Sequence, residues 1–251
     1  MENDLYIKLL KLIRTRYLES DKLPPEEVLA AELGISRVKL RDVLAVLEVQ
    51  GYINRKKGVG TLINRCLVNE PVRLDIDAIY EETVREAGFR ARTQVRSIQY
   101  LEKTPEEIAK ILGVDPAEST YAVEKVIYAD ETPVIFLRDY VLASFYNQTN
   151  IDMELLEKST FAFVERYVPG ALESIVVHLD ACEANEAVAQ ALQLRQGEPV
   201  LRLDSTCFSI RSESVLCSVE YHNTKILPYC IYKRMNRTRF YTLGTHPQEN
   251  N

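Results

Sequence analysis

Only Gly34 and Ile35 separate two helical patterns near the N-terminus, and this short connection restricts the fold more than any other feature. The first pattern, LPPEEVLAAELG, has prolines and glutamates at its start and a glycine after its last turn. The second begins at Ser36, a favourable N-cap residue. Its apolar residues have the spacing of a core-facing helix: Leu40, Val43, Leu44 and Leu47. Two helices joined so tightly predict a helix-turn-helix.

A further helix and a hairpin are predicted on either side of this pair. In LYIKLLKLIRTRYL the apolar residues recur with the helical period: Leu5, Leu9, Leu12 and Ile13. After Gly51, the stretch YINRKKGVGTLIN alternates like a strand, breaks at Gly58 and Gly60, and then resumes. Residues 1–65 are therefore predicted to form a winged helix-turn-helix domain.

The net charge of the chain changes sign after residue 65. Residues 1–65 carry 12 basic and 9 acidic side chains, net +3, whereas the remaining residues carry 19 and 28, net −9. Arginine matches O6 and N7 of guanine in the major groove, which suits Arg37 and Arg41 at the start of a reading helix. Lysines such as Lys56 and Lys57 suit phosphates beside the wing. Taken singly, each charge fits an ordinary solvated surface, but their combination with the tight turn and wing predicts binding to double-stranded DNA.

The stretch from Leu23 to Ile63 resembles the winged helix-turn-helix of the GntR family of bacterial transcription regulators. The family has DNA-contacting helix residues where this chain has Ser36, Arg37 and Arg41, and usually threonine where it has Lys39. The resemblance, with the basic wing, implies DNA contacts at Ser36, Arg37, Lys39, Arg41, Lys56, Lys57, Gly58 and Gly60.

Two departures from the family pattern lie at the start of the helix before the turn. The family commonly has a serine where this chain has Pro25, and an arginine where it has Glu27. A carboxylate cannot hold a phosphate, so the resemblance does not establish the family's usual operator of GT and AC half-sites for this chain.

The second part of the chain contains an internal repeat. Residues 104–126 align with residues 184–206 at an offset of 80, and PVIFLRDY at 133–140 aligns with SVLCSVEY at 214–221 at an offset of 81. Each copy predicts a strand, a helix, a turn and a two-strand hairpin. Pairing the copies would give one antiparallel sheet covered by helices, with a pocket at the seam. The predicted fold class is thus α+β, with domains at 1–65 and 76–242, a linker at 66–75 and a tail at 243–251.

Four motifs make this part similar to the UTRA effector domain of HutC-type GntR regulators, whose fold is related to chorismate lyase: EAGFRARTQV, ETPVIFLRDYVL, STFAFVERY and SVEYHN. In phosphosugar-responsive members, a loop matching residues 90–93 holds phosphate, and a strand arginine and a serine match Lys125 and Ser159. Ile127 and Leu137 replace polar groups of those members. The resemblance implies effector contacts at Arg90, Arg92, Thr93, Lys125, Arg138, Ser159, Tyr221 and Asn223.

These cations and apolar replacements suit a small anionic effector with an apolar body. For Lys125 and Arg138, a purely structural ion pair explains the residue as well as a ligand contact does. His178 and His222 are expected to be structural.

Composition restricts the function further. Five cysteines without a CxxC motif and three scattered histidines argue against a disulfide framework and a metal site. No apolar run approaches the roughly 18 residues of a membrane span, and the N-terminus is unlike a signal peptide. We therefore expect a cytoplasmic homodimeric regulator, a repressor by preference, that binds operator DNA and a small-molecule effector without a cofactor. A chorismate lyase-like enzyme and a ligand-independent architectural DNA binder are the alternatives.

Overall fold

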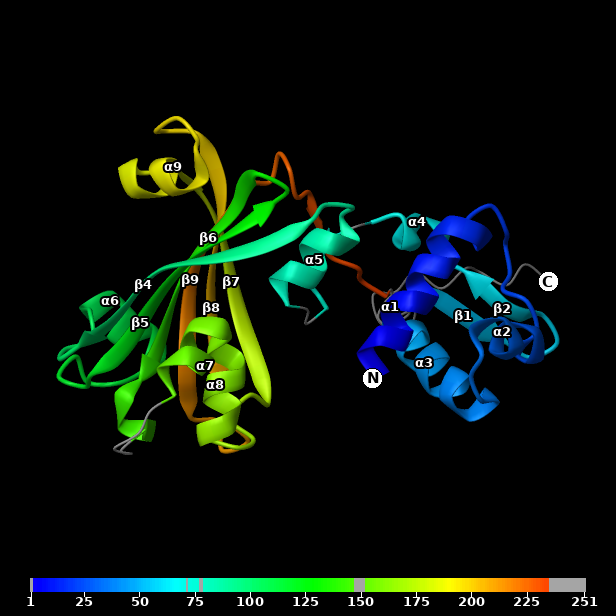
Figure 1. Ribbon diagram of the computed structural model, residues 1–251, viewed down its shortest axis with the longest axis horizontal. Helices are drawn as coiled ribbons and strands as arrows, with labels where there is room; N and C mark the ends of the chain where they lie inside the picture. The colour runs from blue at the N-terminus through cyan, green and yellow to red at the C-terminus, as the bar shows by residue number, and fades with distance from the viewer. Residues whose placement is uncertain (1, 71, 77–78, 147–151, 235–251) are drawn as a thin grey trace, which may run out of the picture. The chain divides into compact units, whose positions relative to one another are not determined.

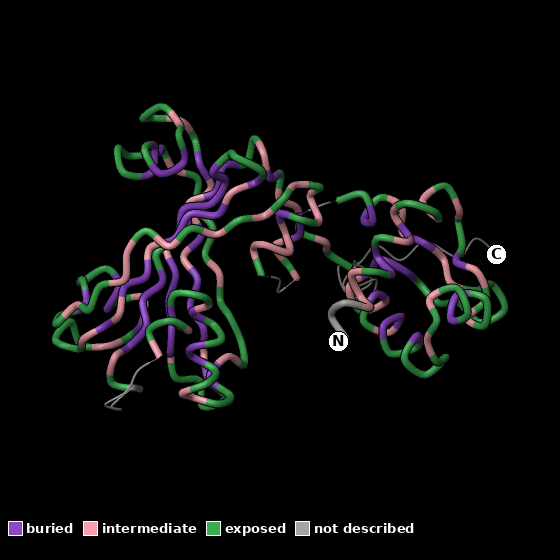
Figure 2. Tube along the Cα trace, viewed as in Figure 1, coloured by how far each residue is buried: buried purple, intermediate pink, exposed green. Residues whose placement is uncertain are grey.

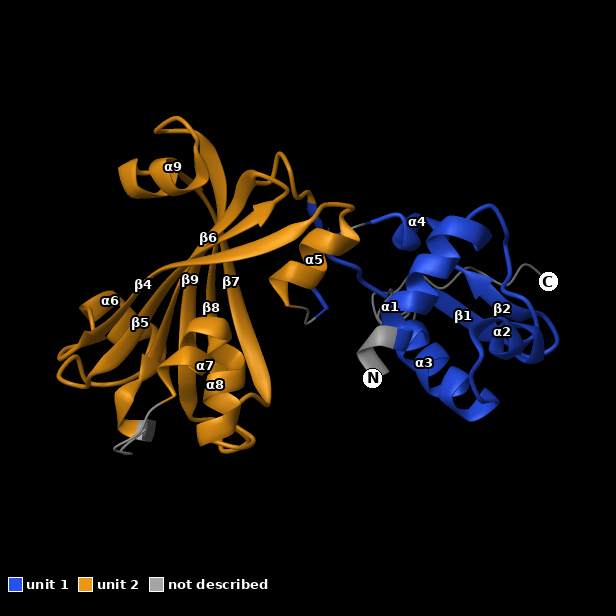
Figure 3. Cartoon of the chain, viewed as in Figure 1, with its two compact units in different colours: residues 1–77, 229–251 blue, residues 78–228 orange. Residues whose placement is uncertain are grey.

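The computed structural model describes residues 2–70, 72–76, 79–146 and 152–234. The chain forms two compact units, shown in different colours in Figure 3. The first unit contains residues 1–77 and 229–251, and the second contains residues 78–228. The predicted tail at 243–251 lies outside the described residues.

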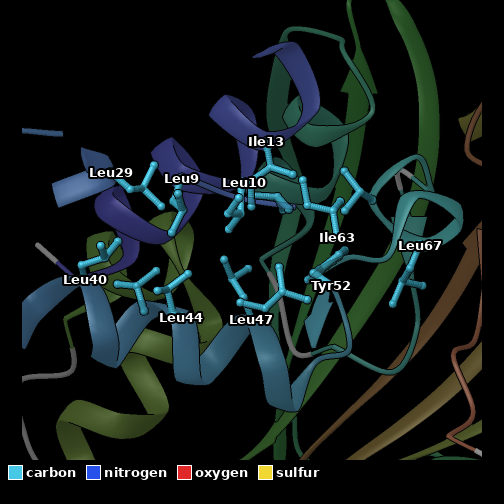
Figure 4. Packing of buried hydrophobic residues seen from close by; sticks show 14 of the residues in the cluster. Leu9, Leu10, Ile13, Leu29, Leu40, Leu44, Leu47, Tyr52, Ile63 and Leu67 are labelled. Carbon is cyan, nitrogen blue, oxygen red and sulfur yellow. The ribbon is translucent and has the colours of Figure 1, made fainter. Parts of the chain in front are cut away.

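The first unit is built on three helical segments packed around one core. Helix α1 (Glu2–Leu12) continues into a π-helical turn η1 (Ile13–Tyr17), and α2 (Glu26–Leu33) and α3 (Arg37–Val49) follow. Figure 4 shows leucines of all three helices meeting in this core. Of the predicted α1 stripe, Leu9 and Ile13 are fully buried, whereas Leu5 and Leu12 pack at its margin.

The predicted turn between α2 and α3 has the geometry that its residues favour. Gly34 ends α2 in the left-handed conformation, with φ +66°, and its amide donates to the Ala31 carbonyl at 3.2 Å. Ser36 then caps α3, since its hydroxyl accepts from the Lys39 amide at 3.3 Å. This turn fixes the start of α3 relative to α2.

The predicted wing is an antiparallel pair of strands, β1 (Ile53–Lys56) and β2 (Gly60–Ile63), with Lys56 opposite Gly60. Gly58 and Gly60 both have positive φ, as the tight turn at the tip requires. Ile53 and Ile63 are buried in the core of the first unit, so the base of the wing is anchored while its tip is exposed.

The stretch predicted as a linker is part of the first unit. Helix α4 (Arg65–Val68) buries Leu67 and Val68 in the core, and β3 (Val72–Arg73) pairs in parallel with β10 (Tyr229–Cys230). Residues 229–234, which the sequence placed in the effector domain, thus return to the first unit. The sequence pattern missed this pairing because both strands are only two residues long.

The second unit is a six-stranded antiparallel sheet in the order β4-β5-β6-β9-β8-β7 (Figure 1). Its strands are β4 (Ala91–Leu101), β5 (Thr120–Ala129), β6 (Thr132–Leu142), β7 (Ser174–Glu183), β8 (Pro199–Phe208) and β9 (Ser214–His222). Helix α6 (Glu106–Leu112) lies between β4 and β5 in the chain, and α9 (Glu186–Leu192) lies between β7 and β8. The two predicted repeat copies are therefore present, and they join where β6 pairs with β9.

The two faces of this sheet are covered by different helices. The face that we call the α8 face is covered by α5 (Tyr80–Glu86), α7 (Met153–Lys158) and α8 (Thr160–Tyr167). A short 3-10 helix η2 (Ala143–Tyr146) follows β6. The opposite α9 face is covered by α6 and α9. Figure 2 shows the buried positions concentrated in the central strands, whereas β7 at the edge is largely exposed.

Two further observations concern the cysteines and the apolar character of the helices. All five cysteines are free. Within the described part of the chain, no helix has the length and apolar character that crossing a membrane requires.

Candidate nucleic-acid interface and effector site

The two arginines at the start of α3 are each held by a glutamate of α2. Arg37 Nη1 lies 2.7 Å from Glu27 Oε1, and Arg41 Nε lies 2.6 Å from Glu26 Oε2. Both guanidinium groups remain about half exposed. They lie one helical turn apart on the side of α3 that faces α2, so the tight turn brings both pairs together.

The other predicted DNA-contacting residues surround these pairs. Lys39 is exposed near the start of α3, and Lys56 and Lys57 are exposed at the tip of the wing. Arg55, by contrast, is bound to α3, because Glu48 accepts from its amide at 2.8 Å and from its Nε at 2.7 Å. These hydrogen bonds hold the pKa of Glu48 below its usual value. The exposed basic side chains of this unit therefore include those at the start of α3 and at the wing tip.

Glu26 is not among the site residues predicted from the sequence, because a favourable interaction with the helix dipole already explains glutamates in the first turn of α2. The spacing of the charged residues in the sequence could have indicated these ion pairs. Two acidic residues in the first turn of α2 face two basic residues in the first turns of α3 across a two-residue connection.

In the second unit, the predicted effector residues lie on both faces of the sheet. Side chains alternate along a strand and share a face across directly paired residues. Thr93 pairs with Ile127 and Val95 with Lys125, which places Thr93 and Lys125 on the α8 face. Arg92 and Tyr128 form the intervening pair on the α9 face, where the Arg92 guanidinium lies 3.8 Å from the Tyr128 ring centroid.

Two more predicted residues belong to the α9 face. Tyr221 stacks on Phe136, with ring centroids 6.3 Å apart, in the cluster beneath α9. Arg138 forms an ion pair with Glu124. The expectation that Arg92, Arg138 and Tyr221 converge with Lys125 is therefore wrong, because the strand register turns them to the opposite side of the sheet.

Lys125 is buried in a chain of polar groups on the α8 face. Its Nζ donates to Thr160 Oγ1 at 2.6 Å and lies 3.5 Å from Asp139 Oδ2. Thr160 Oγ1 in turn donates to Asp139 Oδ2 at 2.6 Å, and Ser218 donates to the other oxygen of the same carboxylate. The structural ion pair that the sequence left open for Lys125 is thus present.

The remaining predicted residues have local partners. The Arg90 amide donates to Asp130 Oδ1 at 3.0 Å, while its guanidinium is exposed, and Thr93 donates to Glu81 of α5. Ser159 caps α8 by accepting from the Ala162 amide at 3.2 Å. Asn223 is buried after β9, where its side chain accepts from the Lys225 amide at 3.2 Å.

A second buried polar cluster on the α8 face was not predicted as a site. Glu220 accepts from Tyr80 of α5, and His222 Nε2 lies 3.0 Å from the same carboxylate oxygen. The rings of Tyr80 and His222 meet edge to face with centroids 5.4 Å apart. At the repeat offset of 81, Glu220 is the equivalent of Asp139, so each copy contributes one buried carboxylate beside the seam. The alignment of the two repeat copies could therefore have predicted this second buried carboxylate.

A basic winged helix-turn-helix joined to a repeated sheet with polar groups at its seam defines a class of protein, the DNA-binding transcription regulators with an effector domain. Residues 2–63 match the model of bacterial regulatory proteins of the gntR family, and residues 86–227 match that of the UTRA domain. The chain belongs to the GntR family of regulators, in the HutC-type group that carries a C-terminal UTRA domain.

Individual relatives agree with this assignment. The HTH-type transcriptional repressor NagR of Bacillus subtilis (strain 168) is 24% identical over 212 residues, which cover 81% of this chain and 84% of NagR. The HTH-type transcriptional regulator GgaR of Escherichia coli (strain K12) is 29% identical over 153 residues, covering 55% of this chain and 56% of GgaR. The crystal structure of the possible transcriptional regulator YydK from Bacillus subtilis superimposes with a TM-score of 0.67 at 22% identity, covering 91% of this chain and 99% of YydK.

Proposed function

We propose that this chain is a homodimeric, cytoplasmic repressor that binds an operator with its first unit and a small-molecule effector with its second. The observation that carries the proposal is the exposed basic surface of α3 and the wing, joined in one chain to a UTRA domain. One reading helix covers too few base pairs for a specific site, which supports a dimer on two half-sites. We propose repression, rather than activation, because the relative NagR is named a transcriptional repressor.

The α8 face is the proposed effector site. Lys125, Asp139 and Glu220 are charged groups that lie close to the seam between the repeat copies, on the same side of the sheet. Exchanging some of their internal hydrogen bonds for bonds to a ligand would leave them satisfied. Thr93 lies on this face of β4 and stays a candidate for the site, whereas Arg90 precedes β4 and has its exposed guanidinium beside Asp130.

The charges on this face modify the effector class that the sequence suggested. Lys125 is matched by Asp139, and Arg92 and Arg138 lie on the other face, so the support for a purely anionic effector is weak. Two buried carboxylates favour a molecule that also carries donors or a positive charge. Zwitterions and amines therefore belong in a ligand screen together with acids and sugar phosphates.

The experiment uses the full chain. Selection from a random duplex library yields the preferred duplex, and a thermal-shift screen identifies ligands, because a ligand that binds only the folded state raises the melting temperature. Each ligand found is then titrated into the protein–duplex complex. We expect at least one to change the dissociation constant about fivefold or more.

The same experiment addresses the alternatives. Ligands that bind without changing DNA affinity, or no stabilising ligand at all, would favour an architectural protein. Consumption of a ligand during incubation would favour an enzyme. Failure to enrich any duplex would contradict the proposal altogether.

A further inference from the structure

The ion pairs between α2 and α3 place negative charge against the two arginines that are expected to read DNA. Arg37 and Arg41 supply the fork-shaped donors of α3, yet Glu27 and Glu26 occupy one N–H group of each. Glu27 is itself strongly exposed, with 72% of its side chain accessible. Glu26 is less exposed, with 27% of its side chain accessible. Neither carboxylate is part of the core, and each lies beside an arginine that is expected to contact DNA.

A guanidinium has five N–H donors, so one bond to a carboxylate leaves four. A guanine edge needs two of them, at O6 and N7, and these acceptors carry no formal charge. A phosphate carries a full negative charge, and it would be repelled by a carboxylate 2.7 Å from the same guanidinium. The pairs thus leave base contacts available while making phosphate contacts less favourable.

From this geometry we infer that Glu26 and Glu27 are specificity-determining residues, which direct Arg37 and Arg41 toward guanine edges and away from phosphates. The inference rests on the proposed DNA-binding function. Discrimination arises here from weakening the wrong contacts, since phosphate contacts carry no sequence information. Lys39, Lys56 and Lys57 are then left to supply the phosphate contacts of this surface.

The test compares Glu26→Gln and Glu27→Gln in the full chain with the parent. Glutamine retains an acceptor oxygen and nearly the same shape but removes the charge. Binding is measured for the selected duplex and for a shuffled duplex of equal composition over a series of salt concentrations. We expect each variant to bind the shuffled duplex about fivefold more tightly, the scale of one exposed ion pair.

The salt dependence provides a second readout. An arginine released to a phosphate should steepen the slope of log K against log salt by about 0.9 for the shuffled duplex. Affinity for the selected duplex should change less than twofold, since the base contacts persist. The ratio of the two affinities should then fall about fivefold for each variant and further for the double variant.

Glu32→Gln is the matched control, because Glu32 lies on the same helix but pairs with Arg16 and Tyr17 of the preceding segment. It removes the same charge without releasing an α3 arginine. If all three variants alter both duplexes equally, only net charge matters and the inference is wrong. An unchanged ratio in Glu26→Gln and Glu27→Gln also overturns it. Equal binding of the selected and shuffled duplexes by the parent protein would instead contradict the proposed function.

Discussion

At the scale of single residues, Arg37 and Lys57 are expected to play different parts in binding DNA. Arg37 is held near the start of α3 by Glu27, whereas Lys57 is exposed at the wing tip. Arg37→Ala should cost about 1–3 kcal/mol on the selected duplex and little on a shuffled one. Lys57→Ala should weaken both and reduce the salt slope by about one. Equal losses on both duplexes for Arg37→Ala would show that this arginine only positions the protein.

Substitution of Lys125 is expected to affect stability, because this residue and its partner Asp139 are both buried. Removing its charge leaves Asp139 buried without its cation, at a cost of about 3–5 kcal/mol. Lys125→Met should therefore lower the free energy of unfolding in urea by that amount. Lys125→Met combined with Asp139→Asn should recover part of the loss, because no buried charge then remains unpaired. A small loss in the single variant would contradict a stabilising role for this ion pair.

At the scale of elements, Glu48 connects α3 to the wing through the amide and guanidinium of Arg55. Because its pKa is lowered in the folded protein, its contribution is present above the ordinary glutamate pKa and is lost as the pH falls through the folded value. Glu48→Gln should reduce the free energy of unfolding by up to about 1 kcal/mol at neutral pH. The gap to the parent should narrow as the pH falls below the ordinary glutamate pKa. A gap that is independent of pH would assign the loss to packing.

Prediction from sequence succeeded for elements that a cap residue or a recurring pattern marks. The α2–α3 turn follows from Gly34 and Ser36, and the sheet follows from the repeat, since each depends on a periodic pattern or a cap. The prediction that the effector residues lie together failed because side chains alternate along β4 and β5, which places Arg92 and Lys125 on opposite faces of the sheet. Matching sequence motifs takes no account of this register. The β3–β10 pair was missed because two-residue strands have no period to detect.

At the scale of the whole molecule, the first unit depends on residues from both ends of the chain. The Arg73 guanidinium lies 4.9 Å from the Tyr52 ring centroid and 5.4 Å from that of Tyr232, while its Nη1 donates to the Gln50 carbonyl at 2.6 Å. Tyr232→Ala should therefore destabilise this unit by about 1–2 kcal/mol, measured by denaturation followed by circular dichroism. Ile231→Ala, at a half-exposed position, is the control. Equal effects of the two changes would contradict a specific role for the Tyr232 ring.

The pairing of β3 with β10 also has a consequence for the order of events on the ribosome. The winged helix-turn-helix emerges first, but Tyr229 and Tyr232 follow only after residues 78–228 have been made. At about 5–20 residues per second, that interval lasts roughly eight to thirty seconds. A nascent chain therefore carries a reading helix before Arg73 has its second aromatic partner. The first unit is therefore complete only after the second unit has been synthesised.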